Sequence, residues 1–102
     1  MYAEYADLSG QVAVITGGAG AIGRAISRGL AGNGAKVVLV DIDEPRLQSY
    51  SRELGEEFGL RSILAVKADV RDSEQVGAAF AAALREFGRL DILVNNAAAT
   101  QI

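Results

Sequence analysis

The chain has 102 residues, which suits one small domain, and its net charge of −3 without a basic block argues against nucleic acid or an acidic membrane as partners. It has no cysteine and no histidine, which excludes disulfides and thiol or imidazole catalysis, and we expect no metal site. No apolar run is as long as a membrane span and the first ten residues lack a signal-peptide pattern, so we expect a cytoplasmic protein.

The first predicted elements are a strand and a helix joined by a glycine cluster. Residues 12–16 (VAVIT) form a short β-branched run that ends at glycine, which is typical of a strand. Asn33 and Gly34 suit the C-terminal cap of a helix that starts at about residue 21. The apolar residues that recur every four positions in this helix predict its core-facing stripe, which consists of Ile22, Ile26 and Leu30.

Two further strands flank a second helix. Residues 36–41 (KVVLVD) have no polar face, as expected of a parallel strand covered on both sides, and residues 62–69 (SILAVKAD) predict a third strand. Asp43 can cap the intervening helix, which has Pro45 in its first turn and ends at Gly59. The predicted buried face of this helix consists of Leu47, Tyr50, Leu54 and Phe58.

A third helix and a fourth strand complete the pattern. Asp72 and Gln75 predict a capping box, Gly88 ends the helix, and residues 91–95 (DILVN) predict the strand. The predicted buried stripe of the helix consists of Val76, Phe80, Ala83, Leu84 and Phe87. The resulting order βαβαβαβ favours an α/β fold with a parallel sheet and helices on both faces. We predict a Rossmann-like, doubly wound sheet, of which the chain supplies the first four strands in the order 3-2-1-4.

The glycine cluster behind the first strand predicts a phosphate-binding turn. Gly17, Gly18, Gly20 and Gly23 precede and open the first helix, and they fit both G-x-G-x-x-G and G-x-x-G-x-x-G. The free N–H groups and partial positive charge of a helix N-terminus attract phosphate, and glycine lets the backbone approach it closely. A tight turn whose glycines serve only close packing of helix and strand is the alternative.

An aspartate at the end of the second strand adds a second signal. Asp41 follows Gly23 by 18 residues, where an acidic side chain can accept hydrogen bonds from both ribose hydroxyls of an adenosine. Its charge would repel a 2′-phosphate, and Ile42 offers no arginine to bind one, so NAD is favoured over NADP. Arg24 and Arg46 are nearby cations that would favour NADP. The structural alternative for Asp41 is an aspartate that caps a helix or is solvated.

With these segments in place, the chain resembles the short-chain dehydrogenase/reductase family. The similar segments are DLSGQVAVITGGAGAIGRAI, VVLVDID, ADV and DILVNNAA, in the family's order and spacing across nearly the whole chain. Ala21 replaces the middle glycine of the usual loop, and Ala98 stands where the family usually has glycine. The loop also fits the extended branch of nucleotide-sugar epimerases and dehydratases, but the NNAA and VDIDEPRLQ segments favour the shorter, single-domain branch.

The resemblance implies a set of cofactor-binding residues. In the family, an Asp side chain and the next backbone amide after the third strand meet the adenine ring, and the asparagine motif steadies the sheet beside the adenosine ribose. The implied residues are Gly17, Gly20, Ala21, Ile22, Gly23, Asp41, Ile42, Asp69, Val70, Asn96 and Ala97.

The family's catalytic groups have no counterpart in these residues. Family chemistry resembles general acid catalysis by a tyrosine whose pKa is lowered by a lysine four positions later, assisted by a serine. None of the three tyrosines is followed by such a lysine, so we expect no catalytic residue in this chain. Residues 1–102 are therefore expected to be the N-terminal part of a single NAD(P)-binding domain whose catalytic half is absent. The whole protein would act on a small alcohol or carbonyl compound and form a homo-oligomer.

Two other functions remain open at this stage. The first is a natural half-domain that binds NAD or an adenine nucleotide without turnover. An S-adenosylmethionine-dependent methyltransferase shares the glycine loop and the acid after the second strand, although TGG and NNAA argue against it.

Overall fold

The computed structural model describes residues 7–97, in which strands and helices alternate. The elements are β1 (Val12–Thr16), α1 (Ala21–Gly32), β2 (Lys36–Asp41), α2 (Glu44–Phe58), the short 3₁₀ helix η1 (Leu60–Ser62), β3 (Ile63–Lys67), α3 (Ser73–Phe87) and β4 (Ile92–Asn95). All strand pairs are parallel, and the sheet order is β3-β2-β1-β4. This order confirms the predicted fold. Ala98 lies outside the described residues.

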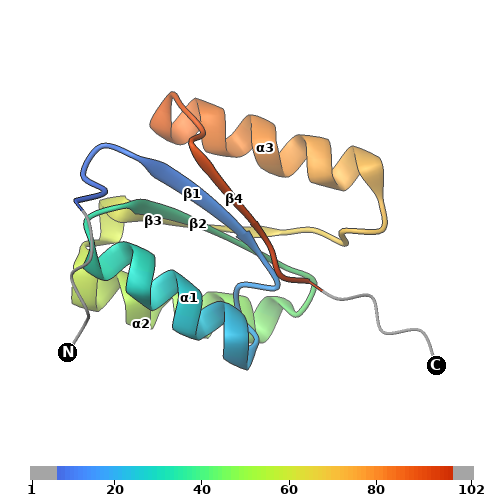
Figure 1. Ribbon diagram of the computed structural model, residues 1–102. Coiled ribbons are helices and arrows are strands. Elements are labelled where there is room, and N and C mark those ends of the chain that lie inside the picture. Colours follow the sequence, from blue (N-terminus) through green and yellow to red (C-terminus); the bar gives the residue numbers. More distant parts are fainter. Residues whose placement is uncertain (1–6, 98–102) are drawn as a thin grey trace.

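The sheet lies between two helical layers, with α1 and α2 on one face and α3 on the other (Figure 1). Alternate side chains of each strand point to opposite faces, so the central strands supply two cores. The first core joins Ile15, Val37 and Leu39 to Leu47, Tyr50 and Leu54 of α2. The second core joins Val12, Val14, Val38 and Val40 to Ala79 and Ala83 of α3. The prediction that the second strand is covered on both faces is therefore confirmed.

Local hydrogen bonds set the ends of the second and third helices. The Asp43 side chain accepts a hydrogen bond from the Arg46 amide at 3.2 Å and caps α2. The Asp72 side chain accepts from the Glu74 and Gln75 amides at 3.0 and 3.3 Å and caps α3. The reciprocal half of the predicted capping box is wrong: Asp72 N donates to the Asp69 carbonyl, and the Gln75 side chain accepts from Asp69 N at 2.8 Å.

The buried faces of two helices differ from the periodicity-based prediction. Ile22 is 68% exposed, and the buried residues of α1 are Gly23, Ser27 and Ala31, because small side chains let the helix lie close to the sheet. On α3, Ala83 is buried as predicted, but Leu84 is 48% exposed, and the buried Ala79 was not predicted. The predicted face of α2 is confirmed, and most of the predicted residues of α1 and α3 also face the cores. The residues that pack there are Ile26, Leu30, Phe80 and Phe87, whereas the predictions for Ile22 and Leu84 are wrong.

The third strand is shorter than predicted. Residues 60–62 form η1, so β3 begins at Ile63 and ends at Lys67. The Ala68 amide still donates to the Asp41 carbonyl at 3.1 Å, which extends the contact between the β2 and β3 ends. None of the helices in residues 7–97 is long and apolar enough to cross a membrane.

Candidate functional site

The loop between β1 and α1 folds back on itself in a way that requires glycine. Gly17 has a φ of 66°, in the left-handed region, and its carbonyl accepts from Gly20 N at 3.1 Å. A Cβ on Gly23 would overlap the Gly17 carbonyl oxygen and would lie 2.9 Å from Gly18 Cα. A Cβ on Gly18 would lie 2.9 Å from Leu39 Cδ2. The chain's own packing therefore requires these three glycines, as the structural alternative proposed.

Gly20 differs from the other glycines of this loop. It is the N-cap of α1, and a Cβ at this position would meet only the Gly17 carbonyl oxygen, at an ordinary contact distance of 3.5 Å. The first intrahelical hydrogen bond joins Arg24 N to Gly20 O at 2.8 Å. The amides of Ala21, Ile22 and Gly23 come before it and have no partner within the helix. Within residues 7–97 no side chain caps this end of α1, and the first turn of this helix has no acidic residue. The result is an open, positively polarised helix start.

Asp41 is held between two loops at the end of β2. Its Oδ2 accepts from Ala19 N and its Oδ1 from Asp43 N, each at 3.0 Å. The side chain therefore braces the glycine loop against the start of α2 and does not cap the helix, which Asp43 does. Each carboxylate oxygen has further acceptor capacity. The adjacent Ile42 is 53% exposed, so an apolar side chain flanks the carboxylate.

Asp69 and Val70 follow β3 on the same edge of the sheet, and both are half-buried. The Asp69 carboxylate accepts from the backbone N, Nε and Nη2 of Arg71 at 2.9–3.0 Å. These hydrogen bonds lower the pKa of Asp69 below its usual value. The carboxylate is thus ionised and already paired, while Ala68 N–H ties this turn to β2.

The asparagine segment after β4 closes against the glycine loop. Asn96 Nδ2 donates to the Gly17 carbonyl at 3.2 Å. The hydroxyl oxygen of Thr16 accepts from the Asn96 and Ala97 amides at 3.0 and 3.1 Å. Thr16 is 7% exposed, and sequence reasoning missed its linking role. Its place at the end of a buried strand, directly before Gly17, was the available signal.

The sequence-predicted residues meet at one edge of the sheet. The glycine loop, Asp41, the Asp69 turn and the Asn96 segment all follow the carboxyl ends of their strands, where open α/β sheets bind ligands. Within residues 7–97 no three side chains of the metal-ligating kinds gather into a cluster. The site offers backbone donors and the Asp41 carboxylate, while the Asp69 carboxylate is already paired with Arg71, and this set suits a phosphate-containing ligand with hydroxyl groups.

The sequence model of the short chain dehydrogenase family matches residues 11–102. The chain belongs to this family. This short-chain dehydrogenase chain is 42% identical over 90 residues to 15-hydroxyprostaglandin dehydrogenase [NAD(+)] of Homo sapiens, a match covering 88% of the chain and 34% of that protein. It spans about a third of the length of this and several other curated relatives.

Two solved structures show the same arrangement with different cofactors. The 3-ketoacyl-(acyl-carrier-protein) reductase of Brucella melitensis, complexed with NADH, is 43% identical with a TM-score of 0.80, over 88% of this chain and 35% of that one. The C-domain of a bacterial malonyl-CoA reductase, solved with NADP, is 35% identical with a TM-score of 0.83, over 89% of this chain and 15% of that one. Both structures share the Rossmann-like fold of this chain.

Proposed function

We propose that this chain is the dinucleotide-binding part of an NAD(H)-dependent oxidoreductase that interconverts a small alcohol and a carbonyl compound by hydride transfer. The observation that carries the proposal is the open N-terminus of α1 beside the Asp41 carboxylate. A pyrophosphate would accept from the amides of Ala21, Ile22 and Gly23, and an adenosine ribose would donate to Asp41. When bound, the nicotinamide ring supplies the hydride acceptor or donor.

The other residues complete this proposed cofactor site. Adenine would lie against the turn of Asp69 and Val70, and Asn96 and Ala97 would border the adenosine ribose. The Asp69 carboxylate is paired with Arg71, so the adenine ring would contact the side of the turn that Val70 forms. The loop itself leaves room for a Cβ on Gly20. A glycine at this position therefore supports the close approach of a pyrophosphate, from which a side chain would hold the backbone away.

The cofactor preference follows from charge. Asp41 presents a carboxylate where a 2′-phosphate would have to lie, and Gly20 and Ile42 provide no cation there. NAD(H) is therefore expected to bind more tightly than NADP(H). The proton-transfer groups of the reaction are proposed to lie outside these 102 residues, because no tyrosine here is followed four positions later by lysine.

Ligand titration tests the proposal directly. The chain has no tryptophan, so NADH fluorescence is read without a protein indole background. NAD(H) and ADP-ribose should bind, and NADP(H) should bind more weakly. Asp41→Asn keeps one acceptor oxygen and removes the charge, so it should reduce the difference in affinity between NAD(H) and NADP(H). Asp41→Ala should also weaken the binding of NAD by about 1.5–3 kcal/mol per lost hydrogen bond. Equal dissociation constants for the two cofactors would refute the preference, and no ADP-ribose binding would refute the site.

A non-catalytic binding module is the second candidate, favoured by the absence of the Tyr-x-x-x-Lys pair from these residues. The reading frame beyond codon 102 separates the two candidates. A downstream serine and Tyr-x-x-x-Lys would support the enzyme, and their absence from the whole protein would support the module. A cytoplasmic location and a homo-oligomeric whole protein stay predictions, which fractionation and sedimentation of that protein would test.

A further inference from the structure

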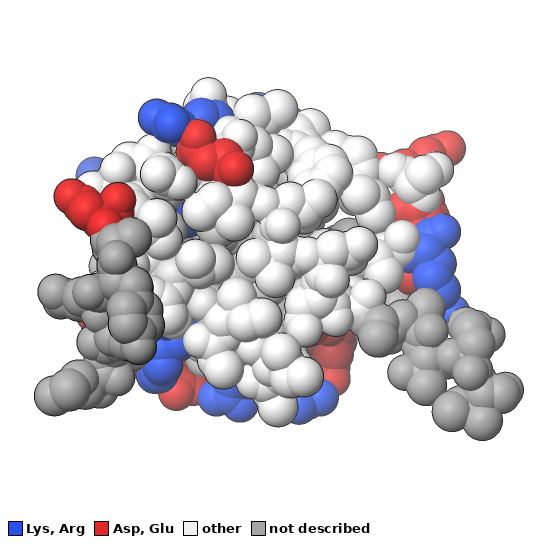
Figure 2. Space-filling view, viewed as in Figure 1, with Lys and Arg blue, Asp and Glu red and all other residues white. Residues whose placement is uncertain are grey.

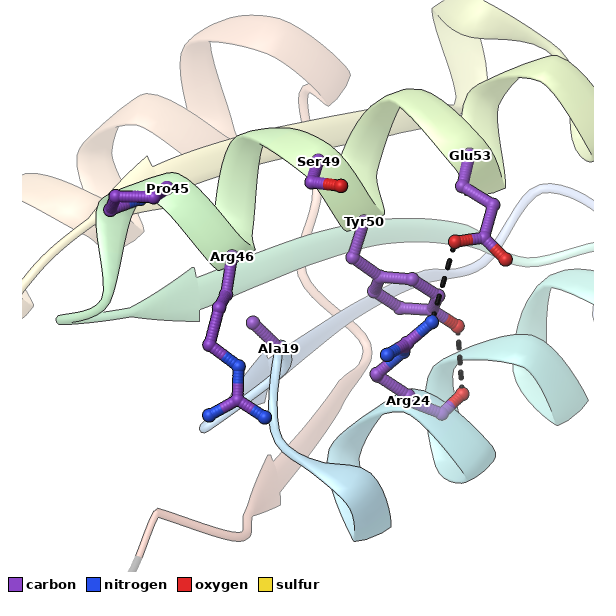
Figure 3. Close-up of a pocket in the computed structure, with 7 residues that line it drawn as sticks. All are labelled: Ala19, Arg24, Pro45, Arg46, Ser49, Tyr50 and Glu53. Carbon is purple, nitrogen blue, oxygen red and sulfur yellow. Dashed lines mark hydrogen bonds and ion pairs between the residues drawn. The ribbon is translucent and has the colours of Figure 1, made fainter.

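A buried tyrosine connects α2 to the first turn of α1 (Figure 3). Tyr50 is 3% exposed, and its hydroxyl donates to the Arg24 carbonyl at 2.8 Å. Ser27 is fully buried beside it, with its Oγ 3.2 Å from the Tyr50 hydroxyl and 3.1 Å from the Arg24 carbonyl oxygen. The hydroxyls of two buried residues thus meet at one carbonyl of α1, where a lost partner would leave a polar group unsatisfied.

The Arg24 side chain is held at the same place. Its guanidinium lies 4.5 Å from the centroid of the Tyr50 ring and 3.3 Å from the Glu53 carboxylate. A cation in the first turn of a helix is opposed by the helix dipole, so this position depends on the ring and the carboxylate. Figure 3 shows Arg24 turned toward α2 along one wall of a pocket of about 260 Å³, with Ala19 of the glycine loop at another wall.

The anchored carbonyl is next to the groups that would bind the pyrophosphate. Arg24 N makes the first intrahelical bond of α1, so its residue directly follows the three amides that have no partner within the helix. Gly23 packs against the glycine loop and anchors one side of this turn, whereas Gly20 has no side chain and Ile22 is exposed, so the contact of Arg24 with Tyr50 anchors the side that faces α2. The direction in which the three amides point therefore depends on the contact between α1 and α2.

We propose that Tyr50 is a positioning residue: its hydroxyl, 2.8 Å from the Arg24 carbonyl, holds the first-turn amides of α1 in the direction needed for the pyrophosphate. This inference rests on the proposed function. Tyr50 acts through Arg24 and does not itself contact the cofactor. The part of the ligand that depends on Tyr50 is the pyrophosphate, whereas adenosine, bound at Asp41 and the Asp69 turn, does not depend on it.

The Tyr50→Phe variant isolates the hydroxyl. The ring, its packing in the core and its contact with the Arg24 guanidinium all remain, and Ser27 still donates to the Arg24 carbonyl, so the variant is expected to fold. Ser51→Ala is the matched control, because it removes an exposed α2 hydroxyl that donates to the Gln48 carbonyl at 3.2 Å. ADP-ribose and adenosine are titrated into the chain and both variants by NMR.

In Tyr50→Phe, ADP-ribose should bind about three- to tenfold more weakly, which corresponds to the net strength of one hydrogen bond, while adenosine affinity stays unchanged. Exchange of the Arg24 amide, which donates to the Gly20 carbonyl, should also be faster than in Ser51→Ala. An equal loss for both ligands, or no loss for ADP-ribose, would overturn the positioning role while leaving the proposed function intact. If the unaltered chain binds neither ligand, the proposed function fails and this inference fails with it.

Discussion

Replacing Gly23 with alanine tests the glycine loop with a single methyl group. The new Cβ would overlap the Gly17 carbonyl oxygen and lie 2.9 Å from both Gly17 C and Gly18 Cα. These obstacles are backbone atoms of a turn fixed by the left-handed φ of Gly17, so no side-chain rotation relieves the overlap. The start of α1 must move away from the loop, and the first-turn amides move with it.

The same substitution elsewhere in α1 provides the control. A Cβ on Gly29 would meet no atom within 4 Å, so Gly29→Ala should stabilise the helix by about 0.4–1 kcal/mol. Overpacking against a rigid neighbour typically destabilises by about 1–3 kcal/mol. The two variants should therefore differ in free energy of unfolding by about 1.5–4 kcal/mol although their composition is identical. Gly20→Ala, with its nearest contact at 3.5 Å, should keep most of the stability but weaken ADP-ribose binding.

Urea unfolding followed by circular dichroism measures the stability of the chain and its three variants under one set of conditions. We expect Gly23→Ala to unfold at a lower urea concentration than the unaltered chain and to lose ADP-ribose binding. If Gly23→Ala unfolded together with Gly29→Ala and bound ADP-ribose normally, the close approach of α1 to the loop would be refuted.

Three further results are expected. Ala21→Gly should bind NAD as the unaltered chain does, because Ala21 is exposed and glycine is the usual family residue; a tenfold change in affinity on titration would contradict this. The Arg89 guanidinium and the Val12 amide lower the pKa of Asp91 in the folded chain. The ionised carboxylate therefore stabilises the fold at pH values above the pKa that Asp91 has in the unfolded chain. This stabilisation is lost as the pH falls through the lower pKa of the folded chain. Arg89→Gln should raise the pKa of Asp91 in an NMR titration, and an unchanged pKa would contradict the assignment. The chain by itself should self-associate through β4, which pairs only with β1 within residues 7–97 and has Leu93 56% exposed. β4 lies at the front in Figure 1, and the centre of the same view in Figure 2 carries no charged side chain. Leu93→Lys should shift sedimentation toward monomer, and an unaltered chain that is already monomeric would refute the edge argument.

Local signals in the sequence predicted the elements of this protein and their order. The β-branched runs, the glycine stops and the caps of α2 and α3 depend on residues a few positions apart, which can be read along the chain. The parallel sheet followed from the alternation of strands and helices and the handedness of crossovers, and the order 3-2-1-4 was taken from the doubly wound dinucleotide fold; both are confirmed. The glycine loop and Asp41 were predicted as cofactor-binding groups from the residues themselves, whereas the Asp69 turn and Asn96 were implied by the family resemblance.

The tertiary structure alone decided how the helices are rotated and which polar groups meet across the fold. Apolar spacing favoured Ile22 and Leu84 as core residues, but close packing on the sheet instead turned small residues such as Gly23 inward. The contacts of Asp41 with Ala19 and of Tyr50 with Arg24 join residues more than 20 positions apart. Such contacts depend on interhelical distance and rotation, which are set by packing of the whole core and leave no periodic signal in the sequence.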